Sequence, residues 1–123
     1  MVGKRTIVVK LGGSTLGSHD TTLEDLVSLQ RNGVNAVVVH GGGRSISEWL
    51  ERLGVSPKFV KGLRVTDADT MKVVTAVLAG MVNKELVAAI QWLGGKAIGL
   101  SCADGRIVRA EIKDAELGYV GEI

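Results

Sequence analysis

Hydrophobic residues recur along the first half of the chain with two different periods. Two β-branched runs, each ending at a cluster of glycines, are typical of buried strands, and apolar residues at helical spacing follow each run. The predicted elements are a strand at Thr6–Leu11, a helix capped by Asp20 or Thr21 and ended by Gly33, a strand at Val34–His40, and a helix at Ser45–Leu53 ended by Gly54. This strand–helix–strand–helix order predicts βαβ units around a parallel sheet.

The second half of the chain predicts a more varied set of elements. These are a short hairpin at Lys58–Thr66 around Gly62, a capping box of Thr66 and Asp69, a long helix to about Leu93 with a kink at Gly80, a strand at Lys96–Ser101, a turn at Ala103–Gly105, its partner strand at Arg106–Ile112, and a strand-like segment at Leu117–Ile123. The long helix repeats apolar residues at i, i+4, which predicts one continuously apolar core face. The chain stops within an extended segment, so we expect it to be a piece of a longer protein.

Composition narrows the class of protein. A chain of 123 residues with 46% hydrophobic and 23% charged residues has the size and composition of one soluble globular domain. A formal charge of +2 without a basic run argues against nucleic acid or membrane surfaces as partners. The single cysteine, Cys102, excludes an internal disulfide and a multi-cysteine zinc site, and fits a reducing cytoplasm. We expect no signal peptide and no apolar stretch long enough to span a membrane.

The most informative segment is Val39-His40-Gly41-Gly42-Gly43-Arg44. Three glycines between a strand and a helix let the backbone approach a ligand closely, because no Cβ atom stands in the way. The helix that follows adds the positive end of its dipole and unpaired amides. This segment therefore predicts a site for a carboxylate or a phosphate.

A second glycine cluster ends the first strand, where Lys10 precedes Gly12 and Gly13. In a parallel α/β sheet, ligands bind outside the carboxyl ends of the strands, so both clusters and the lysine should share one edge. That arrangement suits the binding of a charged small molecule. The most specific function that it suggests is phosphoryl transfer. A Walker A pattern is missing from the sequence, which argues against a P-loop nucleotidase.

Several motifs, in the right order and at the right spacing, resemble the amino acid kinase superfamily. They are Val9-Lys10-Leu11-Gly12-Gly13, Val39-His40-Gly41-Gly42-Gly43, Lys61-Gly62-Leu63-Arg64-Val65-Thr66, Gly80-Met81-Val82-Asn83-Lys84, Ile98-Gly99-Leu100-Ser101 and Asp104-Gly105. Within the superfamily, the Gly-Leu-Arg-Val-Thr segment is most similar to the acetylglutamate kinases of arginine biosynthesis. The resemblance covers essentially the whole chain, but only the N-terminal part of such proteins.

The resemblance implies a three-layer αβα sandwich with a mainly parallel sheet, here truncated. It implies transfer of the γ-phosphoryl group of ATP, with Mg²⁺, to the side-chain carboxylate of N-acetyl-L-glutamate. Residues 1–123 would then be an incomplete N-terminal amino-acid-substrate domain. The C-terminal domain, which holds the nucleotide and most of the Mg²⁺ contacts, would be absent, so the piece alone should be inactive. The resemblance also implies a cytoplasmic homodimer, and the start of the first strand near Met1 favours the arginine-insensitive type.

The resemblance also assigns roles to individual residues. It makes Lys10 the catalytic clamp on the transferring phosphoryl group, Gly12 and Gly13 phosphate-binding residues, and Gly42, Gly43 and Arg64 substrate-binding residues, with no metal ligand. A catalytic base is unnecessary because a carboxylate with a pKa of about 4 is already ionised at neutral pH. Positioning and charge neutralisation should carry the reaction.

Each assignment has a structural alternative. Lys10 could extend into solvent from a strand end, the glycines could serve tight turns or close strand–helix packing, and Arg64 could pair with Asp67 or Asp69 on the surface. His40 is expected to be a hydrogen-bonded structural residue. For the whole chain, the alternatives are a sister kinase acting on an aminoadipate derivative or another small acid, and a stand-alone ligand-binding or dimerisation module.

Overall fold

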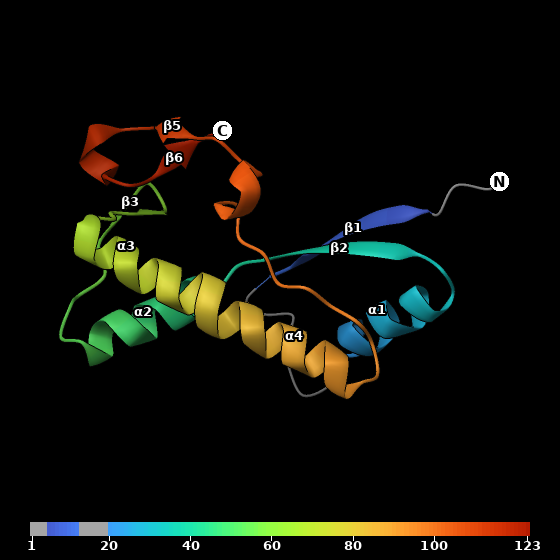
Figure 1. Ribbon diagram of the computed structural model, residues 1–123. Coiled ribbons are helices and arrows are strands. Elements are labelled where there is room, and N and C mark those ends of the chain that lie inside the picture. Colours follow the sequence, from blue (N-terminus) through green and yellow to red (C-terminus); the bar gives the residue numbers. More distant parts are fainter. Residues whose placement is uncertain (1–4, 13–19) are drawn as a thin grey trace.

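The computed structural model describes residues 5–12 and 20–123, and Figure 1 shows their arrangement. The elements are β1 (Thr6–Leu11), α1 (Thr22–Arg31), β2 (Asn35–His40), α2 (Gly43–Arg52), β3 (Phe59–Val60), β4 (Leu63–Arg64), α3 (Ala68–Thr75), the π-helical η1 (Ala76–Val82), α4 (Asn83–Trp92), the 3₁₀ turn η2 (Asp104–Arg106), β5 (Glu111–Ile112), the 3₁₀ turn η3 (Ala115–Leu117) and β6 (Gly121–Glu122). The predicted elements up to residue 66 are confirmed, with α2 beginning two residues earlier than expected.

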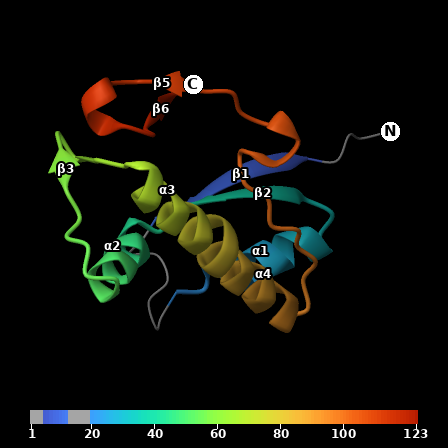
Figure 2. The same ribbon diagram turned by 60° about the vertical axis from the view of Figure 1, so that its left-hand side comes forward.

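The β1–β2 pair is the sheet that positions the glycine clusters. The two strands are parallel, with Thr6 opposite Asn35 and Leu11 opposite His40, as the βαβ pattern predicts. Figures 1 and 2 show α1, α2 and α4 on the same side of this pair. On the opposite face, side chains such as Val8 are exposed (72%). The described residues therefore form one layer of helices over one face of the sheet. They do not form the other helical layer that a three-layer αβα sandwich has on the opposite face.

The core lies between α2 and the long helix. Ile46 and Leu50 of α2 pack with Val77 of η1, and all three are at most 5% exposed. Partly buried aliphatic side chains surround this cluster, namely Val73, Val74, Leu78, Met81 and Val82. The core is thus aliphatic, as the low aromatic content requires, and it holds α2 against the middle of the long helix.

The long helix runs through α3, η1 and α4 without a break, from Ala68 to Trp92. Gly80 lies inside the π-helical segment, so the backbone there widens its turns where the sequence predicted a kink. By length and composition alone this helix would suffice to cross a membrane, because it contains an 18-residue window with a mean hydropathy of 1.7. The expectation that no apolar stretch is long enough is therefore wrong. In the structure the helix packs against α2 and α1.

The predicted capping box of Thr66 and Asp69 is wrong. The N-cap of α3 is Asp67, whose Oδ1 accepts the Thr70 amide at 2.7 Å. Thr66 is buried, and its hydroxyl donates to the Arg64 carbonyl at 3.0 Å. Its own amide donates to the carbonyl of Leu117 at 2.9 Å. Thr66 is thus engaged in a tertiary contact, and the neighbouring aspartate provides the cap.

The predicted strand at Lys96–Ser101 does not form a ladder, because side chains occupy its backbone groups. Gln30 of α1 bonds both the amide and the carbonyl of Lys96 at 2.7 Å. From α4, Lys84 donates to the Gly99 carbonyl at 3.0 Å and Asn83 to the Leu100 carbonyl at 3.3 Å. These bonds attach the segment to two helices instead of to a second strand.

The predicted hairpin between that segment and Arg106–Ile112 is wrong for the same reason. Within the predicted strand Arg106–Ile112, only the last two residues form a strand, β5. This strand pairs with β6 in an antiparallel ladder, with Glu111 opposite Glu122. The turn itself is confirmed, because Gly105 has a φ of +58° within η2. The strand-like segment at Leu117–Ile123 is confirmed only at β6, since Leu117 belongs to η3.

Candidate functional site

The carboxyl edge of the β1–β2 pair holds Lys10, Gly12 and the Gly41–Gly43 turn. In the parallel register, Lys10 lies opposite Val39, and the Gly41 amide approaches the Leu11 carbonyl at 3.4 Å. Lys10 is exposed, and Gly12 directly follows β1. Gly13, the other predicted phosphate-binding residue, lies outside the described residues. Lys10 thus lies at the same edge of the sheet as the turn that leads into α2, and the strand alternation puts its side chain on the same exposed face as Val8.

The glycines of that turn differ in their surroundings. Gly42 is the N-cap of α2, and a Cβ atom there would lie 2.6 Å from Leu78 Cδ2 and 3.3 Å from Val82 Cγ2. Close packing against η1 therefore requires glycine at this position. A Cβ atom on Gly41 or Gly43 would meet nothing within 4 Å. The space beside Gly43 is therefore open, next to first-turn amides of α2 that have no partner within the helix.

Arg64 lies against this turn. Its Nη2 donates to the Gly43 carbonyl and to Ser47 Oγ, both at 2.9 Å. The Ser47 hydroxyl in turn donates to the Gly43 carbonyl at 3.2 Å. The guanidinium also stacks over the Phe59 ring at 4.7 Å from its centroid, a cation–π contact across the β3–β4 hairpin. Three contacts thus fix the guanidinium at the start of α2.

A second guanidinium nitrogen of Arg64, Nη1, has no hydrogen-bond partner in the described structure. Nη1 is buried and donates to no acceptor among residues 5–12 and 20–123. Burial lowers the pKa of the Arg64 guanidinium from its usual value, although arginine stays protonated at neutral pH. The alternative of a surface ion pair is excluded, because Asp67 caps α3 and Asp69 pairs with Lys72 at 2.8 Å. A buried cationic donor without a partner favours an anionic ligand.

His40 has the structural role that was expected of it. Its Nδ1 lies 2.9 Å from the Gly41 carbonyl oxygen, and its Nε2 lies 3.1 Å from Asn83 Nδ2. Asn83 is buried at the start of α4. The imidazole therefore connects the glycine turn to the long helix.

Sequence reasoning missed three residues at this site: Ser47, Phe59 and Asn83. Ser47 stands four residues after Gly43 on α2, one helical turn along, so its position was available as a signal. Phe59 faces Arg64 because the two are opposite each other in the β3–β4 ladder. Asn83 reaches His40 from 43 residues away, and no local pattern announces such a contact.

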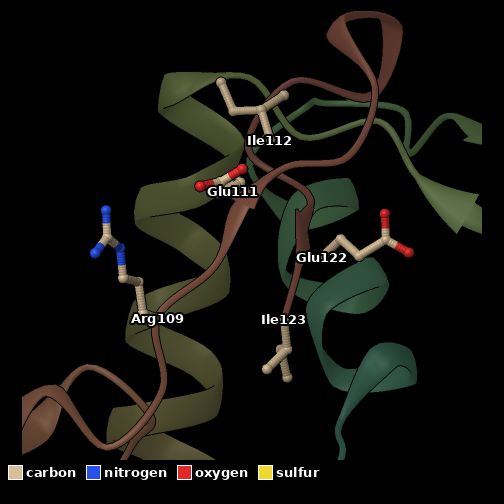
Figure 3. A pocket seen from close by; sticks show the side chains of 5 residues that line it. All are labelled: Arg109, Glu111, Ile112, Glu122 and Ile123. Atoms are coloured by element: carbon tan, nitrogen blue, oxygen red, sulfur yellow. The ribbon is translucent and has the colours of Figure 1, made fainter.

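No metal site was found in the described part of the chain. Residues 5–12 and 20–123 hold no group of three or more histidine, cysteine, aspartate or glutamate side chains suited to an ion. They therefore offer no site in which protein side chains alone would enclose a Mg²⁺ ion. Figure 3 shows a hollow on the β5–β6 hairpin, and none of the predicted site residues lines it. Its labelled side chains point in different directions and do not converge on a ligand.

These features define a class of protein. A parallel βαβ unit with glycine turns, a helix N-terminus and two cationic side chains at its carboxyl edge is an α/β unit suited to bind a small anion. The sequence profile of the amino acid kinase family matches residues 5–123. The chain therefore belongs to the amino acid kinase family.

Curated relatives carry the name acetylglutamate kinase. The chain is 43% identical over 122 residues to that of Dehalococcoides mccartyi and 48% identical over 124 residues to that of Thermoanaerobacter pseudethanolicus. The alignments cover 99% and 97% of this chain, but only 45% and 42% of the relatives. The resemblance to acetylglutamate kinases is confirmed, and the chain spans less than half the length of the relatives it matches.

Solved structures support the fold class. The crystal structure of smu.665 from Streptococcus mutans matches 94% of this chain and 48% of its own length, with a TM-score of 0.84 and 33% identity. An N-acetylglutamate synthase from Neisseria gonorrhoeae, solved with coenzyme A and N-acetyl-glutamate, matches with a TM-score of 0.61 at 23% identity. The second likeness concerns the fold alone. The predicted α/β fold of the amino acid kinases is thus confirmed.

Proposed function

We propose that this chain is the amino-acid-substrate-binding part of an acetylglutamate kinase, which transfers the γ-phosphoryl group of ATP to the side-chain carboxylate of N-acetyl-L-glutamate. The observation that carries the proposal is the Arg64 guanidinium, fixed at the N-terminus of α2 with its Nη1 buried and unpartnered. A carboxylate is the anion that such a planar fork and the adjacent amides bind well. The name of the curated relatives supports this choice.

Each predicted site residue receives a role under this proposal. Arg64 holds the α-carboxylate of N-acetyl-L-glutamate, while Gly42 and Gly43 present backbone to the reacting carboxylate. Lys10, exposed at the same edge of the sheet, neutralises the transferring phosphoryl group. Gly12 and Gly13 would bring backbone amides to the phosphates. The parallel register supports this grouping, because Lys10 and the glycine turn belong to the same edge of the sheet, while Arg64 contacts Gly43 directly.

The chemistry requires charge neutralisation and no proton removal. An oxygen of the ionised side-chain carboxylate attacks the γ-phosphorus, the bond to the β–γ bridging oxygen breaks, and ADP leaves as an acyl phosphate forms. Both reactants are anions, so cationic side chains and aligned amides lower the barrier. ATP and its Mg²⁺ would be bound mainly by the C-terminal part of the parent enzyme. The described residues include no group of three or more side chains that would enclose this ion by themselves.

The parent enzyme would be a cytoplasmic homodimer of arginine biosynthesis. Residues 1–123 would be its N-terminal substrate domain, and the nucleotide domain would belong to the remainder of the parent chain. The fraction of the relatives that is matched, 45% or less in these alignments, supports this division. We therefore expect the 123-residue chain alone to bind the amino-acid substrate without phosphorylating it.

Calorimetric titration tests the proposal. The chain should bind N-acetyl-L-glutamate saturably and more tightly than N-acetyl-L-aminoadipate, whose side chain is one methylene longer. One methylene is worth roughly 10-fold or more in affinity. A preference for the aminoadipate compound would favour the sister kinase, and absence of binding by either compound would favour a dimerisation module. Turnover of ATP by the chain alone would contradict its proposed inactivity.

A further inference from the structure

A chain of hydrogen bonds runs from the long helix to the glycine turn. Asn83 is only 6% exposed, and its Nδ2 lies 3.1 Å from His40 Nε2. His40 Nδ1 lies 2.9 Å from the Gly41 carbonyl oxygen. In Figures 1 and 2 the long helix passes beneath the β1–β2 pair, so this contact joins the two layers of the domain. This series of hydrogen bonds ends at the Gly41 carbonyl, in the turn that leads into α2.

The neighbours of Asn83 fix which of its atoms donates. Lys84 Nζ, which can only donate, lies 3.0 Å from Asn83 Oδ1 and 3.0 Å from the Gly99 carbonyl. The Leu100 carbonyl, which can only accept, lies 3.3 Å from Asn83 Nδ2. Both partners therefore require Oδ1 as the acceptor and Nδ2 as the donor. The side-chain amide has one orientation that satisfies them.

The amide orientation in turn fixes the tautomer of His40. Because Asn83 Nδ2 donates toward the imidazole, Nε2 must accept and carries no proton. Because the Gly41 carbonyl only accepts, Nδ1 must carry the proton and donate. The arrangement is thus satisfied at every atom by the neutral Nδ1–H form of His40. Lys84, Asn83 and His40 form a directed series in which each member sets the next.

The last member of the series is the peptide between Gly41 and Gly42. In a trans peptide the carbonyl and the following amide point in opposite directions. A Gly41 carbonyl held on His40 therefore turns the Gly42 amide away from the imidazole. Glycine at both positions leaves this peptide easy to rotate, so a hydrogen bond that holds it has a large effect on its orientation.

We propose that Asn83 and His40 are positioning residues, which together hold the Gly41–Gly42 peptide with its amide oriented for an anionic ligand at the start of α2. The identity of that ligand, the reacting carboxylate of N-acetyl-L-glutamate, rests on the proposed function. Neither side chain is assigned a contact with the ligand. Their effect passes through the peptide, so they act on the geometry of binding and not on the chemical step.

Imidazole ¹⁵N NMR of the 123-residue chain tests the series directly. The chain has two histidines, so His19→Gln assigns the His40 signals. At about pH 8, where an ordinary imidazole is neutral, His40 should carry its proton on Nδ1. In Asn83→Asp a carboxylate that only accepts replaces the donor, and the proton should move to Nε2. The Nε2–H form in the unaltered chain, or an unchanged tautomer in Asn83→Asp, would overturn the inference.

Ligand affinity separates positioning from simple packing. In Asn83→Asp, the Kd for N-acetyl-L-glutamate should rise about fivefold or more, as loss of one oriented hydrogen bond implies. His40→Asn keeps a donor near the Nδ1 position, whereas His40→Gln places its amide near Nε2, so His40→Asn should retain more affinity. Asp69→Asn, on the exposed side of α3, is the matched control and should change neither tautomer nor Kd.

The outcomes distinguish this inference from the proposed function. Equal Kd values for Asn83→Asp and the unaltered chain, or better binding by His40→Gln than by His40→Asn, would refute the positioning role. If the unaltered chain shows the expected tautomer but binds no N-acetyl-L-glutamate, the proposed ligand is wrong while the hydrogen-bonded series stands. Should Asn83→Asp fail to fold, the two His40 variants decide the matter.

Discussion

Arg64 and Gly43 are joined by a hydrogen bond of 2.9 Å from the guanidinium Nη2 to the backbone carbonyl. This bond connects the β3–β4 hairpin to the first residue of α2, across 21 positions of sequence. It uses one side of the guanidinium and leaves Nη1 buried without a partner in the described structure. The hairpin therefore supplies a pre-oriented cationic donor at a helix N-terminus, and a ligand need not order this side chain on binding.

Replacement of Arg64 by lysine should weaken binding of N-acetyl-L-glutamate. Lysine keeps the positive charge but loses the planar guanidinium. Only that group can bond Gly43 and Ser47 and at the same time donate to the ligand. The loss of an oriented charge-assisted bond, about 1.5–3 kcal/mol, predicts a Kd higher by roughly 10- to 100-fold. Calorimetry would measure it. Arg52→Lys is the matched control, because Arg52 also stacks on an aromatic ring, Trp49, but away from this site; an equal loss there would contradict the assignment.

Alanine at Gly42 and alanine at Gly43 should have different effects on stability. The Cβ of Gly42→Ala would overlap Leu78 and crowd Val82, so we expect a loss of about 1–3 kcal/mol in the free energy of unfolding. Gly43→Ala meets open space at the first position of α2 and should leave stability within about 0.5 kcal/mol of the unaltered chain. Urea denaturation would compare the two. A loss for both of equal size would show that the two positions are not distinguished by packing.

Gly99→Ala should destabilise the attachment of the segment that follows α4. Its Cβ would overlap Asn83 Oδ1, so the Asn83 side chain would have to move away from Lys84, which donates to Oδ1, and from His40, which lies against Nδ2. Loss of one or two hydrogen bonds of a buried amide predicts about 1–3 kcal/mol in unfolding free energy. In contrast, Gly80→Ala meets nothing within 4 Å inside the helix and should stabilise the chain by roughly 0.5–1 kcal/mol. Thermal unfolding of both variants would check the two signs.

Acid should weaken the start of α3. The Thr70 backbone amide, and then the Thr70 side chain, lower the pKa of Asp67 below its ordinary value. Since the folded-state pKa is the lower one, the stabilisation is present above the unfolded value of about 3.9 and is lost as the pH falls through the folded pKa. Asp67→Asn can still accept the Thr70 amide but does not titrate.

Urea unfolding at a series of pH values would test this effect of Asp67. The loss of stability below about pH 4 should be shallower in Asp67→Asn than in the unaltered chain. Glu51→Gln, at an exposed position near the end of α2, is the control for removal of one carboxylate. A pH dependence of Asp67→Asn that coincides with the unaltered chain would show that this cap does not contribute.

The elements that local pattern predicted well are those whose partners are near in sequence. β1, α1 and β2 follow one another along the chain, and the β-branched runs and terminal glycines suffice to place them. Lys96–Ser101 has an equally good strand pattern, but its backbone groups bond to Gln30, Asn83 and Lys84. Whether an extended segment joins a ladder depends on which donors and acceptors reach it, and residue 30 is 66 positions away.

In the candidate site, too, residues marked by local sequence signals were predicted from the pattern, and residues placed by long-range contacts were not. Gly42, Gly43 and Lys10 were found because strand ends and glycine turns are local signals, and the parallel register brings them to one edge. Arg64 was assigned from family resemblance, and its position against Gly43 is a tertiary fact that no spacing rule supplies. Asn83 was named only as part of the Gly80–Lys84 motif, and its contact with His40, 43 positions away, is visible only in the structure. Gly42 proves to be constrained by packing against Leu78 as well.

The π-helical segment between α3 and α4 limits how the sequence of this region can vary among relatives. Val77 packs against α2, whereas Asn83 contacts His40, so the helix must present both side chains at the correct rotation. Removal of one intervening residue would rotate everything beyond it by about 100° and shift it by about 1.5 Å along the axis. Aligned relatives that keep the His40 contact should therefore differ here by substitution alone, with an alignment free of gaps between these two positions.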